Sequence, residues 1–318
     1  MNKFTKLAVI LVAATLPNVI SARPFAYISN QLDDSVSIIN TNTRTVVKTL
    51  TVKGKPAGVA ISPDGKRVYV STPEAGGFSA IDAEKQAEIR HVEVSSGALG
   101  IVAAPDGKFI YIADWYKDSV YVVDAITFKT LGSVTVGKSP SGLVVSPDNR
   151  WLFVANRLSN SVTQIDLHKM TIRNTTLVGS HPFGLAIDKK GTRIYAANVQ
   201  SDDVTVLDAQ NLKRIATVKV NLLPYALTLA LNGKRLFVTN QDDGSVSVID
   251  TDSLKEIRLI RVGDKPEGIY THPDDKHVYV ANWFDGTVSV IDAESLEVSD
   301  TIKTGEGSRA FGQFISNN

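Results

Sequence analysis

Short apolar runs, separated by Gly, Pro, Asn and Asp, cover the chain from residue 24 almost to its end. Val, Ile, Tyr and Phe dominate these runs, and apolar residues do not recur at the three- and four-residue intervals of a helix. The pattern predicts an all-β protein. In residues 58–94, Pro63-Asp64-Gly65 forms a tight turn between the first two strands, since Pro fixes φ and Gly supplies a positive φ. The four strands of this stretch are expected at residues 58–61, 67–71, 78–81 and 88–94.

One strand end recurs along the chain at a constant step of 42 residues. Tyr27-Ile28-Ser29-Asn30 is its first copy and Tyr279-Val280-Ala281-Asn282 is its seventh. A second marker, Asn or Asp at the end of the next strand, keeps the same step at Asn40, Asp82, Asp124, Asp166, Asp208, Asp250 and Asp292. Four strands in a repeat of about 40–45 residues are typical of a propeller blade. The predicted fold is therefore a seven-bladed β-propeller with four antiparallel strands in each blade.

The two ends of the repeat array are expected to share one blade. The N-terminal unit begins with a second strand at residues 24–30, and residues 310–315 supply a lone strand in register with the first strand of the other units. An open stack of repeats would need atypical caps instead. We therefore predict that residues 24–52 and 310–315 complete one blade, that the ring closes without an exposed edge, and that residues 23–318 form a single domain.

Residues 1–22 lie outside the repeat and resemble a secretory signal peptide. Lys3 and Lys6 precede an apolar run at residues 7–16, Pro17 breaks this run, and Ala22 is a small residue suited to cleavage. The run is shorter than the roughly 20 residues of a membrane span. We expect a periplasmic or secreted protein without a membrane span.

Composition narrows the possible functions. The chain contains no cysteine, which excludes disulfides, a lipoprotein anchor, thiolate metal sites and covalent haem attachment. Loss of residues 1–22 removes two lysines and no acid, so the formal net charge falls from +1 to −1. A nearly neutral protein has no general attraction to nucleic acids or anionic membranes. Nucleic acid is thus not an expected partner, and we expect a monomer.

The Tyr-Val-Ala-Asn strand end, the Ser-Pro-Asp-Gly turn and the Val-Ile-Asp strand together resemble the YVTN-repeat β-propellers of surface-layer and periplasmic proteins. The resemblance covers residues 24–316. It implies the propeller fold, but the members of that family are mostly binding or uncharacterised proteins. Seven-bladed lactonases share the architecture more loosely, and they hold a metal with carboxylates and Asn at the mouth of the channel.

The propeller topology brings two sets of loops to one face, around the mouth of the central channel. The first set carries a Pro-x-Gly motif whose middle position should ring the mouth, at Ala57, Leu99, Ser141, Phe183, Tyr225, Glu267 and Arg309. Phe183, Tyr225, Glu267 and Arg309 come from four consecutive blades, and His181 precedes Phe183. Two interpretations stay open. These residues form either a ligand pocket with an apolar wall and convergent polar groups, or an ion pair between Glu267 and Arg309 beside an aromatic plug.

The second set of loops, between the second and third strands, carries Trp115, Tyr116, Arg157, Trp283 and Phe284 directly after the strand ends. Exposed aromatic residues with Arg are favoured in protein interfaces. They also suit stacking on sugars or unpaired bases. Alternatively, each ring packs against the loop of a neighbouring blade, since large apolar groups seldom stay fully exposed.

Three acidic pairs, Asp33-Asp34, Asp202-Asp203 and Asp242-Asp243, lie in the same loops. Their spacing matches no compact calcium loop, and Asp commonly caps turns, so we predict turn caps here and at the repeated strand ends. His181 should lie far from the other histidines, because His168, His272 and His277 belong to the opposite face. No metal and no other cofactor is predicted.

These features favour a binding propeller over an enzyme, with a protein partner or small ligand held at the loop face. One alternative is a lactonase- or lyase-like enzyme in which Glu267 or His181 acts as acid or base. A second alternative is binding of single-stranded nucleic acid through Trp115, Arg157 and Trp283.

Overall fold

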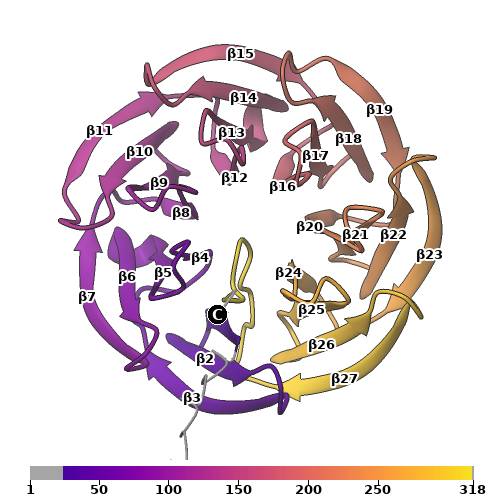
Figure 1. Ribbon diagram of the computed structural model, residues 1–318, viewed down its shortest axis with the longest axis horizontal. Coiled ribbons are helices and arrows are strands. Elements are labelled where there is room, and N and C mark those ends of the chain that lie inside the picture. The colour runs from indigo at the N-terminus through magenta and orange to yellow at the C-terminus, as the bar shows by residue number, and fades with distance from the viewer. Residues whose placement is uncertain (1–23, 317–318) are drawn as a thin grey trace, which may run out of the picture.

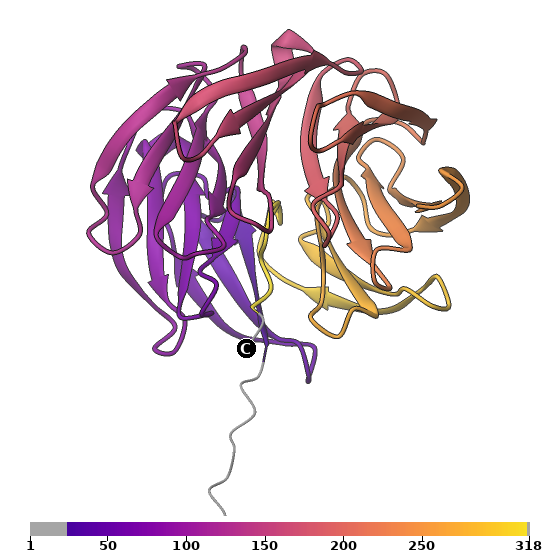
Figure 2. The same ribbon diagram turned by 45° about the horizontal axis from the view of Figure 1, so that its top comes forward.

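The computed structural model describes residues 24–316, and its strands form seven sheets arranged as blades around a central channel (Figure 1). Six sheets have four antiparallel strands each, and one has three. Chain order follows the ring, so each blade runs outward from the channel before the chain passes to the next blade (Figures 1 and 2). The predicted seven-bladed β-propeller is confirmed. The predicted signal peptide lies outside the described residues.

Each four-stranded blade begins at the channel and ends at the rim. The innermost strands are β4 (Val59–Ile61), β8 (Ala98–Ala103), β12 (Pro140–Val145), β16 (Pro182–Ile187), β20 (Pro224–Ala230) and β24 (Pro266–Thr271). The second strands are β5 (Arg67–Thr72), β9 (Phe109–Asp114), β13 (Trp151–Asn156), β17 (Arg193–Asn198), β21 (Arg235–Asn240) and β25 (His277–Asn282). The third strands are β6 (Gly77–Asp82), β10 (Ser119–Asp124), β14 (Ser161–Asp166), β18 (Asp203–Asp208), β22 (Ser245–Asp250) and β26 (Thr287–Asp292). The outermost strands are β7 (Ala87–Glu93), β11 (Thr130–Thr135), β15 (Thr171–Leu177), β19 (Arg214–Lys219), β23 (Lys255–Arg261) and β27 (Glu297–Lys303).

The first blade consists of β1 (Phe25–Asn30), β2 (Ser35–Asn40) and β3 (Thr45–Thr51), together with the C-terminal segment. Two short 3₁₀ turns, η1 (Pro73–Ala75) and η2 (Arg157–Ser159), follow second strands. We call the face that carries the connections between blades and the loops between second and third strands the loop face. The opposite face carries the remaining hairpin turns and is called the turn face. Among the described residues, no helix has the length and apolar character needed to cross a membrane.

An Asn at the end of five of the seven second strands ties the loops of its blade together. The Asn156 amide donates hydrogen bonds to Ser161 Oγ at 3.1 Å and Thr163 Oγ1 at 2.8 Å, and its carbonyl oxygen accepts one from the Gly137 backbone at 3.1 Å. The same pair of amide donations recurs at Asn30, Asn198, Asn240 and Asn282. In all five blades the buried Asn amide has two acceptors, which explains why the residue repeats. The predicted role in turn capping is confirmed.

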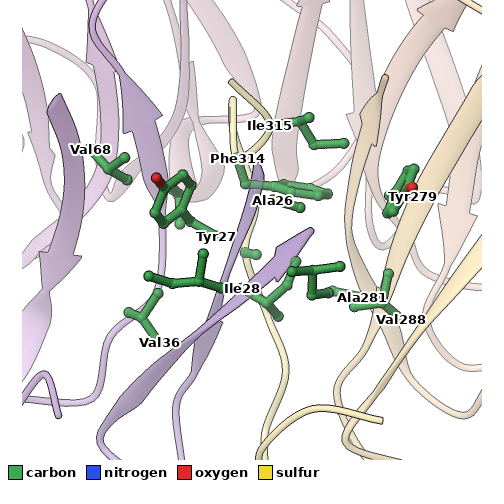
Figure 3. Close-up of a cluster of buried hydrophobic side chains, with 14 of the residues drawn as sticks. Ala26, Tyr27, Ile28, Val36, Val68, Tyr279, Ala281, Val288, Phe314 and Ile315 are labelled. Carbon is green, nitrogen blue, oxygen red and sulfur yellow. The ribbon is translucent and has the colours of Figure 1, made fainter. Parts of the chain in front are cut away.

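The closing blade combines the two ends of the chain, as predicted. The backbone N–H of Tyr27 donates to Phe314 at 2.8 Å, and that of Ser316 donates to Phe25 at 2.9 Å. Figure 3 shows Phe314 and Ile315 among the side chains of the first blade, with Tyr279 of the seventh blade beside them. The two blades therefore share one apolar core, to which the C-terminal segment contributes.

The C-terminal strand is not in the predicted register. In the seventh blade Thr271 pairs with Val278, and the same register would place Gln313 opposite Ala26. The structure places Ile315 there, two residues further along the chain. The extra residues form a bulge at residues 311–313, in which Gly312 has a φ of +94°, and this bulge projects into the channel (Figure 1). The prediction was wrong here because no repeated strand-end residue follows residue 310, so the sequence does not show that the register shifts by two residues.

On the turn face, the turn between β24 and β25 is fixed by Asp274. Its carboxylate accepts hydrogen bonds from the backbone N–H groups of Lys276 at 2.9 Å and His277 at 3.1 Å, and lies 2.7 Å from His277 Nδ1. Burial alone would raise the pKa of Asp274, but these hydrogen bonds outweigh it and lower that pKa to about 2.

A depressed carboxyl pKa stabilises the fold at every pH above the unfolded-state value and loses that effect as the pH falls through the folded-state value. We expect Asp274→Asn to lower the free energy of unfolding by on the order of 1 kcal/mol at neutral pH, because the group is partly exposed and screened by solvent. The difference from the unaltered protein should shrink between about pH 4 and pH 2. Urea titrations across that range measure it, and a difference that is constant with pH would contradict the assignment.

Candidate functional site

Aromatic side chains close the channel mouth on the loop face. Phe183 stacks on Tyr225 with ring centroids 3.9 Å apart, and Phe311 of the C-terminal bulge meets Phe183 edge-on at 5.2 Å. All three are buried in one cluster with Ala57 and Leu99. The predicted ring of middle positions thus does converge. It forms a plug with apolar contacts instead of an open pocket.

Glycine in the Pro-x-Gly motif allows this convergence, because the innermost strands approach each other closely at the mouth. A Cβ atom on Gly142 would lie 2.3 Å from the carbonyl oxygen of Phe183, and one on Gly184 would lie 2.6 Å from that of Tyr225. Each of these glycines therefore faces the middle residue of the following blade. Blade six has Ala226 at this position, and there the Cβ atom is accommodated.

Glu267 and Arg309 form an ion pair beside the aromatic plug. Arg309 Nε lies 2.7 Å from Glu267 Oε2, and the Gln241 amide donates to Glu267 Oε1 at 2.6 Å. Arg309 also donates from Nη2 to the Tyr225 hydroxyl. Glu267 is only 5% exposed. The pair therefore holds two charges out of water and links the innermost strand of blade seven to the C-terminal segment.

The protonation states in this cluster follow from burial and the neighbouring charges. Burial raises the pKa of the Tyr225 hydroxyl well above its usual range, so the phenol is neutral and accepts the hydrogen bond from Arg309. Burial would lower the pKa of Arg309, but the attraction of Glu267 outweighs it, and the net shift is upward. Arg309 therefore stays charged, and its charge is balanced by the carboxylate of Glu267.

The plug continues outward through the second set of loops. The Trp115 ring lies 6.4 Å from that of Phe183, and the Arg157 guanidinium lies 5.3 Å from the Trp115 ring. Arg157 forms no salt bridge within residues 24–316; its guanidinium packs over the indole, and its Nε atom is buried.

His181 is held by its backbone. Its N–H donates to Asn160 Oδ1 at 2.8 Å, its φ is +56°, and the buried ring atom Nδ1 has no hydrogen-bond partner among the described residues. No contact joins His181 to Glu267 or Tyr225 in the described part of the chain. The structure thus leaves His181 apart and brings together six of the predicted site residues: Trp115, Arg157, Phe183, Tyr225, Glu267 and Arg309.

The two residues after each strand end have different roles. The first one packs inward: Trp115 and Trp283 are partly buried, and Trp283 Nε1 donates to Gln31 of the neighbouring blade at 3.2 Å. The second one points to solvent: Tyr116 is 72% exposed and Phe284 is 68% exposed. The predicted alternative, packing against a neighbouring loop, thus describes the tryptophans, whereas the outward aromatic surface comes from Tyr116 and Phe284.

Three further large apolar side chains are exposed on the same face and were missed from the sequence. Leu32 and Leu158 occupy the same repeat position as Tyr116 and Phe284, and Leu222 lies in the connection before β20. A comparison of that one position around the seven repeats would have found the first two. We refer to all five as the apolar set: Leu32, Tyr116, Leu158, Leu222 and Phe284.

Charges divide the loop face into two sectors. Around Tyr116 and Leu158 lies a basic sector, in which the Leu158 N–H donates to the Lys138 carbonyl at 3.1 Å. Around Phe284 and Leu32 lies an acidic sector. The basic sector consists of Lys117, Lys138 and the partly buried Arg157. In the acidic sector, Asp33, Asp264, Asp285 and Glu306 outnumber Lys55 and Lys265, which pair with Asp34 and Asp242.

The predicted acidic pairs form hydrogen bonds and an ion pair with neighbouring loop residues. Asp34 Oδ1 accepts the backbone N–H of Lys55 at 2.9 Å, Asp202 Oδ1 accepts that of Leu223 at 2.9 Å, and Asp243 pairs with Arg261 at 2.7 Å. Within residues 24–316, no three His, Asp or Glu side chains lie close enough together to hold a metal ion. The carboxylate set of a lactonase does not fit this mouth, since both oxygens of Glu267 face Gln241 and Arg309.

The fold defines the protein as a seven-bladed β-propeller with a plugged mouth and an apolar, charge-divided loop face. Two family models match parts of the chain. The model described as "Lactonase, 7-bladed beta-propeller" matches residues 123–211, and the one described as "YNCE-like beta-propeller" matches residues 226–307. No curated protein matches the sequence. The two models agree with the fold, and the YVTN-repeat type remains a resemblance.

Solved structures also resemble this propeller. Hydrazine synthase of Kuenenia stuttgartiensis is 21% identical with a TM-score of 0.73, over 80% of this chain and 88% of that one. A functionally unknown protein from Desulfotomaculum acetoxidans is 15% identical with a TM-score of 0.80, over 92% and 98%. Dihydro-heme d1 dehydrogenase NirN, in complex with DHE, is 15% identical with a TM-score of 0.69, over 92% and 77%. At these identities the likeness concerns the fold alone.

Proposed function

We propose that this protein is a binding propeller that holds a protein partner on its loop face. The observation that carries the proposal is the apolar set, in which Tyr116 and Phe284 leave about seven-tenths of their side chains in water. Exposed apolar groups gathered on one face are typical of interaction surfaces. Aromatic residues in particular supply the anchors of protein interfaces.

The closed mouth favours a macromolecular partner over a small ligand at this face. Phe183, Tyr225 and Phe311 fill the space that a small ligand would need. The face therefore offers a broad surface, and broad surfaces recognise other proteins by area and complementarity. The partner we propose has two apolar contact regions, one flanked by acidic groups and one by basic groups, which would meet the basic and acidic sectors respectively.

The other two hypotheses have less support from the geometry. A general acid or base at Glu267 would have to be free, whereas its carboxylate is paired with Arg309 and Gln241. Single-stranded nucleic acid would have to stack on Trp115 and Trp283, which are partly buried, on a face that also carries an acidic sector. We further propose that the partner is met outside the cytoplasm, on the basis of the signal peptide predicted at residues 1–22.

The double substitution Tyr116→Ser and Phe284→Ser tests the proposed interface. Each side chain is mostly exposed, so the free energy of unfolding should change by less than about 0.5 kcal/mol. If both rings are interface anchors, each contributes roughly 2 kcal/mol, and affinity for the partner should fall by at least about 100-fold. A partner isolated by cross-linking to the unaltered protein, followed by titration calorimetry against both proteins, measures the change.

Ile126→Ser provides the matched control, because Ile126 is 74% exposed but lies in a turn on the opposite face. It removes a comparable exposed apolar side chain and should leave affinity unchanged. Equal loss of binding in Ile126→Ser would show general stickiness rather than a docking face. Full binding by the double variant would overturn the proposal.

A further inference from the structure

The central channel is hollow beneath the aromatic plug. A cavity of about 770 Å³ begins at the level of Gly100, Gly142 and Gly184, just inside the plug, and extends to Pro105 and Pro273 in turns of the turn face. Pockets of about 300–1,000 Å³ are typical of small-molecule sites. The channel thus has a closed end at the loop face, in line with the aromatic plug that was one of the two interpretations of the sequence, and an accessible end at the turn face.

The wall of this cavity is chiefly apolar. Leu143, Val145, Leu185, Leu227 and Ile269 from four successive blades line it. The innermost strands pair on one side only, so their other edges present backbone N–H and C=O groups toward the channel. Such a wall combines apolar contact area with scattered hydrogen-bonding positions, which suits an apolar molecule that carries few polar groups.

Two side chains in the cavity have uncommitted hydrogen-bonding groups. Among the described residues, neither the Tyr270 hydroxyl nor the Gln313 amide has a hydrogen-bond partner, and both residues belong to the cavity lining. Gln313 reaches this position only because the C-terminal bulge turns into the channel. Burial raises the pKa of Tyr270 to about 12, so its hydroxyl is neutral and can both donate and accept.

The acidic and basic side chains of the lining have partners within the protein. Lys189 Nζ lies 3.4 Å from Asp275 Oδ2 at the rim, and His272 Nδ1 lies 3.1 Å from Asp274 Oδ2. Asp275 also accepts the backbone N–H of Asn232 at 2.5 Å, which fixes this side of the opening. A charged ligand would leave water without finding a free counter-charge deeper in the channel, at a cost of several kcal/mol.

We infer that the channel binds an uncharged, mainly apolar small molecule, which enters from the turn face and forms a hydrogen bond to Tyr270 or Gln313. Phe311 forms the closed end of this site, because it belongs both to the aromatic plug and to the cavity lining. This site is separate from the proposed interface on the loop face and does not depend on it. Each can therefore be tested without the other.

Titration with Nile red, a neutral apolar dye with a carbonyl acceptor, tests the inference. The protein carrying Tyr116→Ser and Phe284→Ser is the background, so that dye bound to the apolar set does not contribute. We expect a saturable rise in fluorescence with one site per chain. In the same background Ala186→Trp places an indole on the cavity wall and should weaken binding at least about ten-fold, and Tyr270→Phe should weaken it about two- to ten-fold.

Ile126→Trp is the control for the added indole, because it places the same group on the turn face outside the cavity lining, and it should bind the dye normally. Gln313→Phe fills the cavity from the bulge and replaces Ala186→Trp if that variant does not fold. Anilinonaphthalene sulfonate, an anionic dye, should bind at least about ten-fold more weakly than Nile red. Absence of saturable Nile red binding, equal binding by a folded cavity-filling variant, or tighter binding of the anionic dye would each overturn the inference.

Discussion

A chain that ends at Lys303 should fail to fold cooperatively, although it keeps every regular strand of the propeller. The truncation removes the fully buried side chains of Phe314 and Ile315 and the backbone partners of Tyr27 and Phe25. It also leaves β1 as an unpaired edge facing the channel, which is a template for aggregation. Urea unfolding followed by circular dichroism, with light scattering for aggregation, measures the outcome.

A single substitution in the C-terminal segment tests the same closure of the ring through a measurable loss of stability. Phe314→Ala should lower the free energy of unfolding by about 3–5 kcal/mol, because the ring is enclosed between the first and last blades. Phe284→Ala makes the same chemical change at an exposed site, and we expect it to cost less than about 0.5 kcal/mol. Similar costs for both variants would mean that the C-terminal segment does not close the ring.

The fold could be predicted from the sequence because each repeat carries its own position markers. At five of the seven second-strand ends an Asn binds the loops of its own blade, and the strand end itself recurs every 42 residues, so the spacing locates each blade. The bulge at residues 311–313 could not be predicted in this way. The last strand has no later marker, and its register is decided by how Phe311 and Phe314 pack, which is a contact between residues far apart in the sequence.

The sequence located the residues at the channel mouth, but it could not decide whether they enclose a pocket. The repeat located the ring of middle positions that includes Phe183, Tyr225 and Arg309, and the structure brings these residues together. Whether such a ring encloses a pocket depends on how closely the backbones approach. Gly142 and Gly184 allow an approach that leaves no room for a ligand between the aromatic rings. The cavity lies deeper in the channel, toward the turn face. Departures from the repeat in the loop-face loops do not indicate a site there.

Arg309→Met should be among the most destabilising single substitutions on the loop face, at about 3–5 kcal/mol. It leaves the Glu267 carboxylate buried with only the Gln241 amide as a partner, and it removes the donor to the Tyr225 hydroxyl. Methionine keeps much of the volume of the arginine stem, so the loss comes mainly from the unpaired charge rather than from a cavity. Chemical unfolding at neutral pH measures the cost.

A double-mutant cycle separates the charge from the packing. The paired variant Glu267→Leu and Arg309→Met removes both charges and should recover a large part of the stability lost in Arg309→Met, because no buried charge remains. Lys276→Met is the matched control, since its exposed pair with Glu294 at 3.3 Å should contribute less than about 1 kcal/mol. If Arg309→Met costs no more than Lys276→Met, the pair is hydrated in solution. The mouth would then be open, and the pocket that the sequence allowed around Tyr225, Glu267 and Arg309 would become the stronger candidate for ligand binding.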